Sequence, residues 1–297
     1  MKLTSRNANL LLLLAAVIWG FAFVAQRVGM RYVGPLTFNG IRFALGAAAL
    51  VPLLMWRRKT GPTTSDDGDR SLVLKGGVVA GLVLFMGATL QQYGVVYTTA
   101  GKAGFITGLY VLFVPLLGLL VGQKTGRFVW AGALTAAGGL YLLSAKGMVG
   151  IDPGDGLVLL SAVFWAAHVL VIGRLSRRVA PVRLAVTQFT VVSILSLIGA
   201  VLFETIDPAA VRAAAIPILY AGLLSVAVAY TLQVVAQRRA QPAHAAVILS
   251  FESVFAALGG WLVLSEGLSI RGLIGCALML VGILMAQIDS GRDSKAS

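Results

Sequence analysis

The sequence predicts an all-α integral membrane protein whose ten transmembrane helices form two inverted repeats of five. Three observations predict this fold: long apolar runs, few charged residues and an internal repeat. Hydrophobic residues make up 58% of the chain and charged residues 12%, whereas about 25% of the residues in a soluble domain are charged. A soluble protein of this size could not bury so much apolar surface.

Ten apolar runs have the length of a membrane-spanning helix, which needs about 20 residues to cross a hydrocarbon core of about 30 Å. Two of the runs, 35–56 and 243–264, each contain one charge, Arg42 and Glu252. The first run is too long for the apolar part of a signal peptide. The eight charge-free runs are 7–26, 76–101, 103–123, 128–145, 156–173, 184–203, 213–237 and 272–288.

The basic residues predict the orientation of the helices. With the N-terminus in the cytoplasm, 17 Lys and Arg residues fall inside and 6 outside, and Arg42 lies within a helix. Cytoplasmic loops of membrane proteins carry an excess of Lys and Arg. We therefore expect a multi-pass protein of the inner (plasma) membrane with both termini in the cytoplasm. The net charge of +13 then reflects topology, and no nucleic-acid partner is expected.

An internal repeat divides the chain into residues 1–147 and 148–297, which form one membrane domain. An offset of 146 places Trp19 on Trp165 and Pro35 on Pro181, and an offset of 142 places Gln91 on Gln233. Because each repeat has five helices, the second enters the membrane from the opposite side, as in alternating-access transporters. Both tryptophans then lie about 16 Å deep, near the midplane.

Two charges inside the predicted helices are candidate site residues, because a charge at the bilayer centre costs at least about 2.5–3.5 kcal/mol. Glu252 is the only carboxylate within the ten spans. It can bind a substrate amine, carry a proton or form a structural hydrogen bond. Arg42 can bind a carboxylate through two parallel hydrogen bonds, or its side chain can extend outward to the interface. The sequence leaves these alternatives open, with outward extension slightly favoured for Arg42.

Uncharged polar and aromatic residues complete the candidate substrate site. His168 lies one helical turn after Trp165, and it is either a cavity residue or a packed histidine. The repeat-related amides Gln91 and Gln233 can bind a zwitterion without a fixed charge. Three tryptophans near helix ends are expected to be interfacial anchors: Trp56, Trp130 and Trp261. The candidate aromatic cage consists of Trp19, Phe23, Tyr97, Tyr110, Trp165 and Tyr230.

Several classes of function lack the residues they require. With one cysteine, Cys276, and two separated histidines, no metal site is expected. An enzyme would need a cluster of catalytic groups, and a channel would need rings of charge or carbonyl groups. A phosphate-sugar exchanger would need several cationic side chains in the cavity. We therefore expect no catalytic residues and a small-molecule substrate moved across the lipid bilayer, by a monomer.

Two segments carry a family resemblance: residues 15–24, AAVIWGFAFV, and residues 251–261, FESVFAALGGW. With them, the chain resembles the drug/metabolite transporter superfamily, in its EamA-type ten-helix exporters, over nearly its whole length. It is most similar to the bacterial exporters of aromatic and neutral amino acids. This resemblance implies export without a cofactor or ATP, a cavity lined by helices 1–4 and 6–9, and peripheral helices 5 and 10.

The chain departs from the family pattern at two places. Ser253 stands where proline is common, which removes an expected kink in the ninth helix. Gly122-Gln123 in the first repeat matches Ser265-Glu266 in the second, so a paired glutamate in both halves is not expected. An amino acid exporter is the first functional hypothesis. The alternative is a proton-coupled efflux pump for organic cations, because one carboxylate with an aromatic cage suits a cation.

The topology makes a direct prediction. Both termini and the polar loop from Thr60 to Arg70 should be cytoplasmic, because of the asymmetry in basic residues. Single cysteines introduced at positions 65 and 150 should differ in reaction with a membrane-impermeant reagent added to intact cells: position 150 should be labelled and position 65 protected. Strong labelling at 65 with none at 150 would contradict the orientation.

Overall fold

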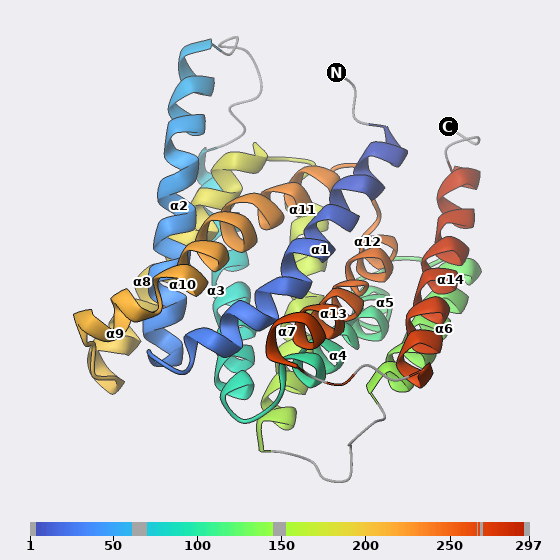
Figure 1. The fold of residues 1–297 in the computed structure, drawn as a ribbon. Helices are drawn as coiled ribbons and strands as arrows, with labels where there is room; N and C mark the ends of the chain where they lie inside the picture. The colour runs from blue at the N-terminus through green and yellow to red at the C-terminus, as the bar shows by residue number, and fades with distance from the viewer. Residues whose placement is uncertain (1–3, 61–69, 145–152, 266, 268–269, 294–297) are drawn as a thin grey trace.

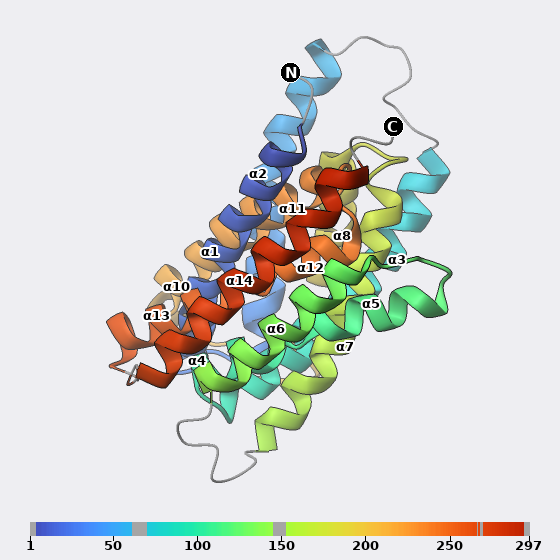
Figure 2. The same cartoon turned by 90° about the vertical axis from the view of Figure 1, so that its right-hand side faces the viewer.

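The computed structural model describes residues 4–60, 70–144, 153–265, 267 and 270–293, and all regular structure within them is helical. Three predicted features lie outside the described residues: residues 61–69 of the polar loop, the repeat boundary at 147/148, and Glu266. The helices pack into one bundle in which the first residues of α1 and the last turns of α14 lie at the same end (Figures 1 and 2).

The first half of the chain contributes six helices: α1 Ser5–Gly29, α2 Pro35–Thr60, α3 Arg70–Val96, α4 Ala100–Gly108, α5 Tyr110–Leu120 and α6 Arg127–Ser144. The second half contributes α7 Pro153–Leu175, α8 Pro181–Phe203, α9 Pro208–Ala213, α10 Ala215–Leu219, the π-helix η1 Tyr220–Tyr230, α11 Thr231–Ala236, α12 Pro242–Leu249, α13 Glu252–Leu264 and α14 Ile270–Asp293.

Eight segments of the described chain are long and apolar enough to cross a membrane. They correspond to eight of the ten predicted runs, and three of them combine consecutive helices: Ala100–Leu120, Ala215–Ala236 and Pro242–Leu264. Large apolar side chains such as Leu120, Ile216 and Phe203 are more than three-quarters exposed. A hydrocarbon layer would solvate these side chains, so the chain is a multi-pass membrane protein.

The remaining two predicted runs form α6 and α14, which pack side by side at one edge of the bundle (Figures 1 and 2). Glycines on both helices allow the backbones to approach closely. A Cβ atom at Gly139 would lie 2.5 Å from the Gly275 carbonyl oxygen, and one at Gly282 would lie 2.6 Å from the Gly132 carbonyl oxygen. Small residues at such contacts are typical of membrane helix packing.

Two of the predicted spans are interrupted near their middle. The first break, at Leu109, separates α4 from α5, and the second, at Ser250 and Phe251, separates α12 from α13. The expectation that Ser253 removes the kink in the ninth helix is therefore wrong, because the helix breaks without a proline. The Ser253 hydroxyl donates a 2.6 Å hydrogen bond to the Gly104 carbonyl oxygen of α4, which links the two interrupted spans.

The packing of α1 against α13 positions Glu252 and depends on Gly20. A Cβ atom at Gly20 would lie 2.2 Å from Phe255 Cβ, 2.7 Å from the Glu252 carbonyl oxygen and 2.9 Å from the Ala256 nitrogen. Two of these three atoms belong to the backbone and cannot rotate away. Only glycine therefore permits this approach.

Gly20→Ala should consequently destabilise the folded protein by about 1–3 kcal/mol, the usual cost of overpacking. The measurements are folded yield and thermal unfolding in detergent. Gly138→Ala in α6 is the matched control, because a Cβ atom there meets nothing within 4 Å and alanine favours a helix. Equal stability of the two variants would contradict the close packing of α1 on α13.

Candidate functional site

Ten of the eleven predicted site residues border one cavity in the centre of the bundle, between the two halves of the chain. Tyr97 is the exception, because it follows the end of α3 and its side chain is 57% exposed. The space open to the centres of water-sized molecules is about 40 Å³. The ten residues are Trp19, Phe23, Arg42, Gln91, Tyr110, Trp165, His168, Tyr230, Gln233 and Glu252.

Arg42 is buried, at 2% exposure, so its side chain does not extend outward to the interface. Its Nε donates a 2.9 Å hydrogen bond to Asn39 Oδ1, and Asn39 Nδ2 donates to the Ala88 carbonyl oxygen at 3.2 Å. The guanidinium carbon lies 5.0 Å from the Phe43 ring centre and 5.5 Å from that of Phe38. Aromatic faces stabilise a cation at such distances, and the terminal nitrogens remain free to bind a ligand.

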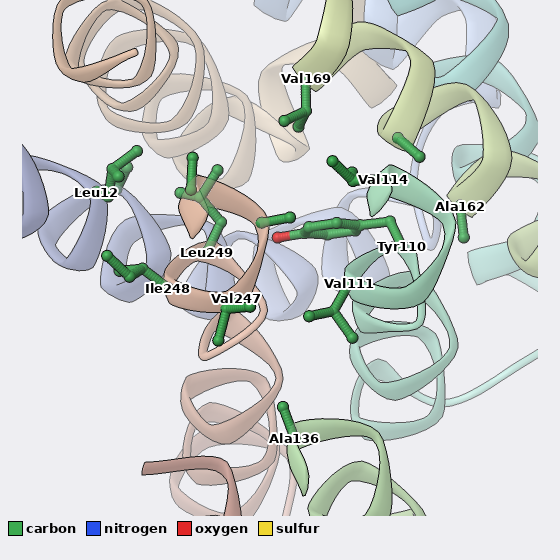
Figure 3. Close-up of a cluster of buried hydrophobic side chains, with 14 of the residues drawn as sticks. Leu12, Tyr110, Val111, Val114, Ala136, Ala162, Val169, Val247, Ile248 and Leu249 are labelled. Atoms are coloured by element: carbon green, nitrogen blue, oxygen red, sulfur yellow. The ribbon is translucent and has the colours of Figure 1, made fainter. Parts of the chain in front are cut away.

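Glu252 begins α13 and is 4% exposed. Neither Glu252 nor Arg42 forms an ion pair with any described residue. Tyr110 lines the same cavity as Glu252, and its hydroxyl has no hydrogen-bond partner among the described residues. Figure 3 shows this hydroxyl pointing from α5 toward the segment that carries Leu249.

Tyr230, at the end of η1, is the centre of the aromatic cage. Its ring centre lies 4.7 Å from that of Trp19, 6.0 Å from that of His168 and 6.2 Å from that of Trp165. It also lies within electrostatic reach of both Arg42 and Glu252. Tyr230, Arg42 and Glu252 all line the same cavity.

Hydrogen bonds between the two halves of the chain fix the tryptophan rings. Trp19 Nε1 donates to the Ser225 carbonyl oxygen of η1 at 3.1 Å, and Trp165 Nε1 donates to Gln91 Oε1 at 2.6 Å. Gln91 Nε2 in turn donates to Gln26 Oε1 at 3.1 Å. The two tryptophan bonds each join one half to the other, whereas the Gln91–Gln26 bond lies within the first half, so the cage depends on contact between the halves.

His168 combines the two alternatives that the sequence left open, because it lines the cavity and is also packed. A ring nitrogen lies 2.9 Å from Gln188 Oε1 of α8. No residue of α8 lines the cavity itself. The family resemblance placed that helix in the lining, and in this structure α8 instead supports the lining through Gln188.

Three polar atoms at the cavity wall are buried without a hydrogen-bond partner among the described residues: Thr107 Oγ1, Tyr110 Oη and Gln233 Oε1. An unsatisfied buried polar group costs about 1–3 kcal/mol. Such atoms are normally satisfied by water or by a ligand. The cavity therefore offers donors and acceptors in addition to its two charges.

The sequence did not single out five residues of the lining. Thr107 and Gln26 carried a signal, since each is a polar residue in a predicted apolar run. Ser225 is also a polar residue in such a run, but it takes part through its carbonyl oxygen, which the residue type does not reveal. The apolar side chains Val169 and Leu249 resemble ordinary core residues, and only the packing shows that they face the cavity.

The profile of the EamA-like transporter family matches the chain twice, at residues 6–145 and 152–287. The chain belongs to the EamA-like transporter family. A relative described as an uncharacterized transporter of Archaeoglobus fulgidus is 33% identical over 95% of this chain and 86% of its own. The uncharacterized transporter YoaV of Bacillus subtilis is 25% identical over 91% and 92%.

Two further comparisons concern location and fold. The uncharacterized inner membrane transporter YedA of Escherichia coli K12 is 25% identical over 50% of this chain and 48% of its own. A solved crystal structure superposes with a TM-score of 0.78 at 20% identity, over 97% of this chain and 98% of that chain. At this identity the second match shows a shared fold alone.

The cage predicts the effect of two substitutions in this EamA-like chain. Trp19→Ala and Trp165→Ala should each lower transport by roughly tenfold while membrane insertion stays normal, because each removes a ring that packs on Tyr230. Trp261→Ala is the control, since Trp261 is 51% exposed on α13. Uptake or efflux per molecule of inserted protein is the measurement. Normal transport by both cavity variants would place the site elsewhere.

Proposed function

We propose that this EamA-like protein is a secondary transporter that exports aromatic and neutral amino acids, or related small metabolites, by alternating access. The observation that carries the proposal is the pair of buried charges, Arg42 and Glu252, on one aromatic cavity. An amino acid zwitterion presents a carboxylate and an ammonium group on one carbon. The cation and carboxyl group of the cavity complement these two groups.

The chemistry of the cavity assigns a role to each part. Arg42 binds the substrate carboxylate through its terminal nitrogens, which have no described protein partner. Glu252 accepts the ammonium group, and Tyr110 and Gln233 contribute the polar atoms that have no partner in the empty cavity. Trp19, Trp165 and Tyr230 enclose the apolar side chain.

The small size of the cavity favours a cycle with a closed state. A volume of about 40 Å³ holds a few water molecules, so binding an amino acid requires the helices to move apart. Leu249, which lines the cavity, belongs to an apolar cluster that also includes Leu12 and Ile248 (Figure 3). Toward the start of α7, Lys102 forms a 2.8 Å ion pair with Asp155.

Correspondences between the halves support ten helices in two inverted repeats. The break at Leu109 falls on Phe251 at the offset of 142. Gly122 and Ser265, which were matched from the sequence, both adopt a left-handed backbone, with φ of 74° and 58°. The two matches to the family profile start 146 residues apart, at residues 6 and 152, which is the offset of Trp19 and Trp165.

Export of organic cations is the second candidate function. Glu252 and the ring faces of Trp19, Tyr230 and Trp165 can bind a cation without help from Arg42. The two hypotheses differ in whether the substrate needs a carboxylate. Radiolabelled amino acids and organic cations, tested in proteoliposomes with and without a pH gradient, distinguish them.

Glu252→Gln separates the possible roles of this residue, because it keeps the shape of the side chain and removes the charge. If Glu252 carries a proton, transport driven by a pH gradient should be abolished while substrate counterflow persists. If it pairs with the substrate amine, both should fall and the apparent affinity should drop by roughly 10- to 100-fold, the worth of a charged hydrogen bond. We expect one of these two results.

The measurements on Glu252→Gln are gradient-driven uptake, counterflow and folded yield. Lower yield with normal activity per molecule would assign Glu252 a structural role only. A variant that is normal in all three measurements would remove Glu252 from the mechanism.

A further inference from the structure

A second hollow of about 590 Å³ opens at the ends of three helices, apart from the central cavity. We call it the basic vestibule. It lies between the turn that follows α5, the end of α7 and the beginning of α12, and the count of basic residues places it on the predicted cytoplasmic side. The residues that characterise it are Lys124, Arg174, Arg177, Arg178, Gln241 and Pro242.

Among the described residues, four cationic side chains and no carboxylate line the basic vestibule. None of the four forms an ion pair with a described residue, and the one hydrogen bond from their side chains is donated by Arg174 Nη2 to the Val121 carbonyl oxygen at 3.0 Å. By contrast, Lys102 on the opposite side of the bundle is paired with Asp155. Uncompensated positive charges around a hollow favour an anion within it.

The beginning of α12 adds to this positive potential. Pro242 is the first residue of the helix, and the Gln241 side chain makes no capping hydrogen bond to the first turn. Backbone N–H groups at the start of a helix carry a partial positive charge and bind phosphate groups. Arginine is suited to the same ligand, because its planar donors match phosphate oxygens.

The surface beside the basic vestibule is apolar. Leu119, Leu120 and Val121 at the end of α5 are 52%, 82% and 44% exposed. Lys124 follows Val121 three residues later in the sequence. Leu119 and Leu120 end the segment Ala100–Leu120, which is long and apolar enough to span the membrane, and Val121 follows it directly. A ligand bound here is therefore offered phosphate-binding groups and a lipid-facing apolar surface together.

We propose that the basic vestibule binds the phosphate headgroup of an anionic phospholipid, whose acyl chains lie against the end of α5. Basic pockets between membrane helices on the cytoplasmic side bind such headgroups in general. The proposal is independent of which substrate the central cavity carries.

Binding in the vestibule also affects the central cavity, because both are built on α7 and α12. Gly173 of the vestibule lies one helical turn from Val169 of the cavity, and Pro242 lies on the same helix as Leu249. A bound headgroup bridges the end of α7 and the start of α12, so it stabilises the arrangement of these two helices. Anionic lipid should therefore raise the thermal stability of the protein.

The test compares two tandem arginine pairs. Arg177→Gln with Arg178→Gln removes two charges from the vestibule, and Arg238→Gln with Arg239→Gln removes two exposed charges that do not line it. Each protein is purified and reconstituted in nanodiscs of phosphatidylcholine alone or with phosphatidylglycerol. Bound phosphatidylglycerol is counted by native mass spectrometry, and thermal unfolding is measured in both lipids.

We expect the vestibule variant to lose at least about tenfold in phosphatidylglycerol affinity, the effect of removing one or more charged hydrogen bonds, together with the lipid-dependent rise in unfolding temperature. The control pair should retain both. The unfolding temperature in phosphatidylcholine alone shows whether the variant is folded, and Lys124→Gln provides a second, milder loss of charge at the same site.

Equal losses in the two arginine pairs would show that diffuse surface charge, rather than the vestibule, attracts the lipid, and would overturn the proposal. A further arm adds inorganic phosphate to the protein in phosphatidylcholine. If phosphate alone reproduces the full stabilisation by phosphatidylglycerol, the hollow is a site for a soluble anion and the lipid assignment is wrong.

Discussion

Arg42 and Glu252 are both buried in a bundle that crosses a hydrocarbon layer, and neither forms an ion pair with a described residue. This arrangement is costly without water or a ligand, because the hydrocarbon offers no solvation to a charge. The surrounding structure reduces the cost: Asn39 and two phenylalanine rings stabilise Arg42, and a cavity separates the two charges. The cavity, its aromatic cage and its unpartnered polar atoms thus surround two opposite charges that are not paired with each other.

The helix packing serves the same arrangement. Gly20 lets α1 approach α13 closely enough to hold Glu252 at the cavity wall. The interruption after α12 places Glu252 in the first turn of a new helix, where the partial positive charge of the helix end favours a carboxylate. The π-helix η1 supplies Tyr230 and the Ser225 carbonyl oxygen from the other side; π-helical turns are rare and frequent at functional sites. Irregular backbone therefore occurs where it borders a polar cavity.

Much of this arrangement could be predicted from the sequence, and the reasons are physical. Membrane helices must be long and apolar, so eight spans were visible as charge-free or nearly charge-free runs, and a charge inside a run marked Arg42 and Glu252. The breaks at Leu109 and Phe251 were not visible, because neither residue is a proline or a glycine, the residue types that commonly interrupt a helix. Tyr97 was predicted to line the cavity and does not, since the direction of a side chain near a helix end depends on tertiary packing. The orientation, the ten-helix inverted repeat and the substrate remain predictions.

The central claim is that Arg42 and Glu252 hold the two ends of one zwitterion. Competition against a bound amino acid in the purified protein tests it most directly, with three matched competitors: phenylalanine, phenylalaninamide, which lacks the carboxylate, and phenylpropionate, which lacks the amine. The account predicts that only phenylalanine competes strongly and that each analogue is weaker by roughly 10- to 100-fold, since each leaves one buried charge unpaired. Equal or stronger competition by phenylalaninamide would contradict the account and indicate a site for organic cations.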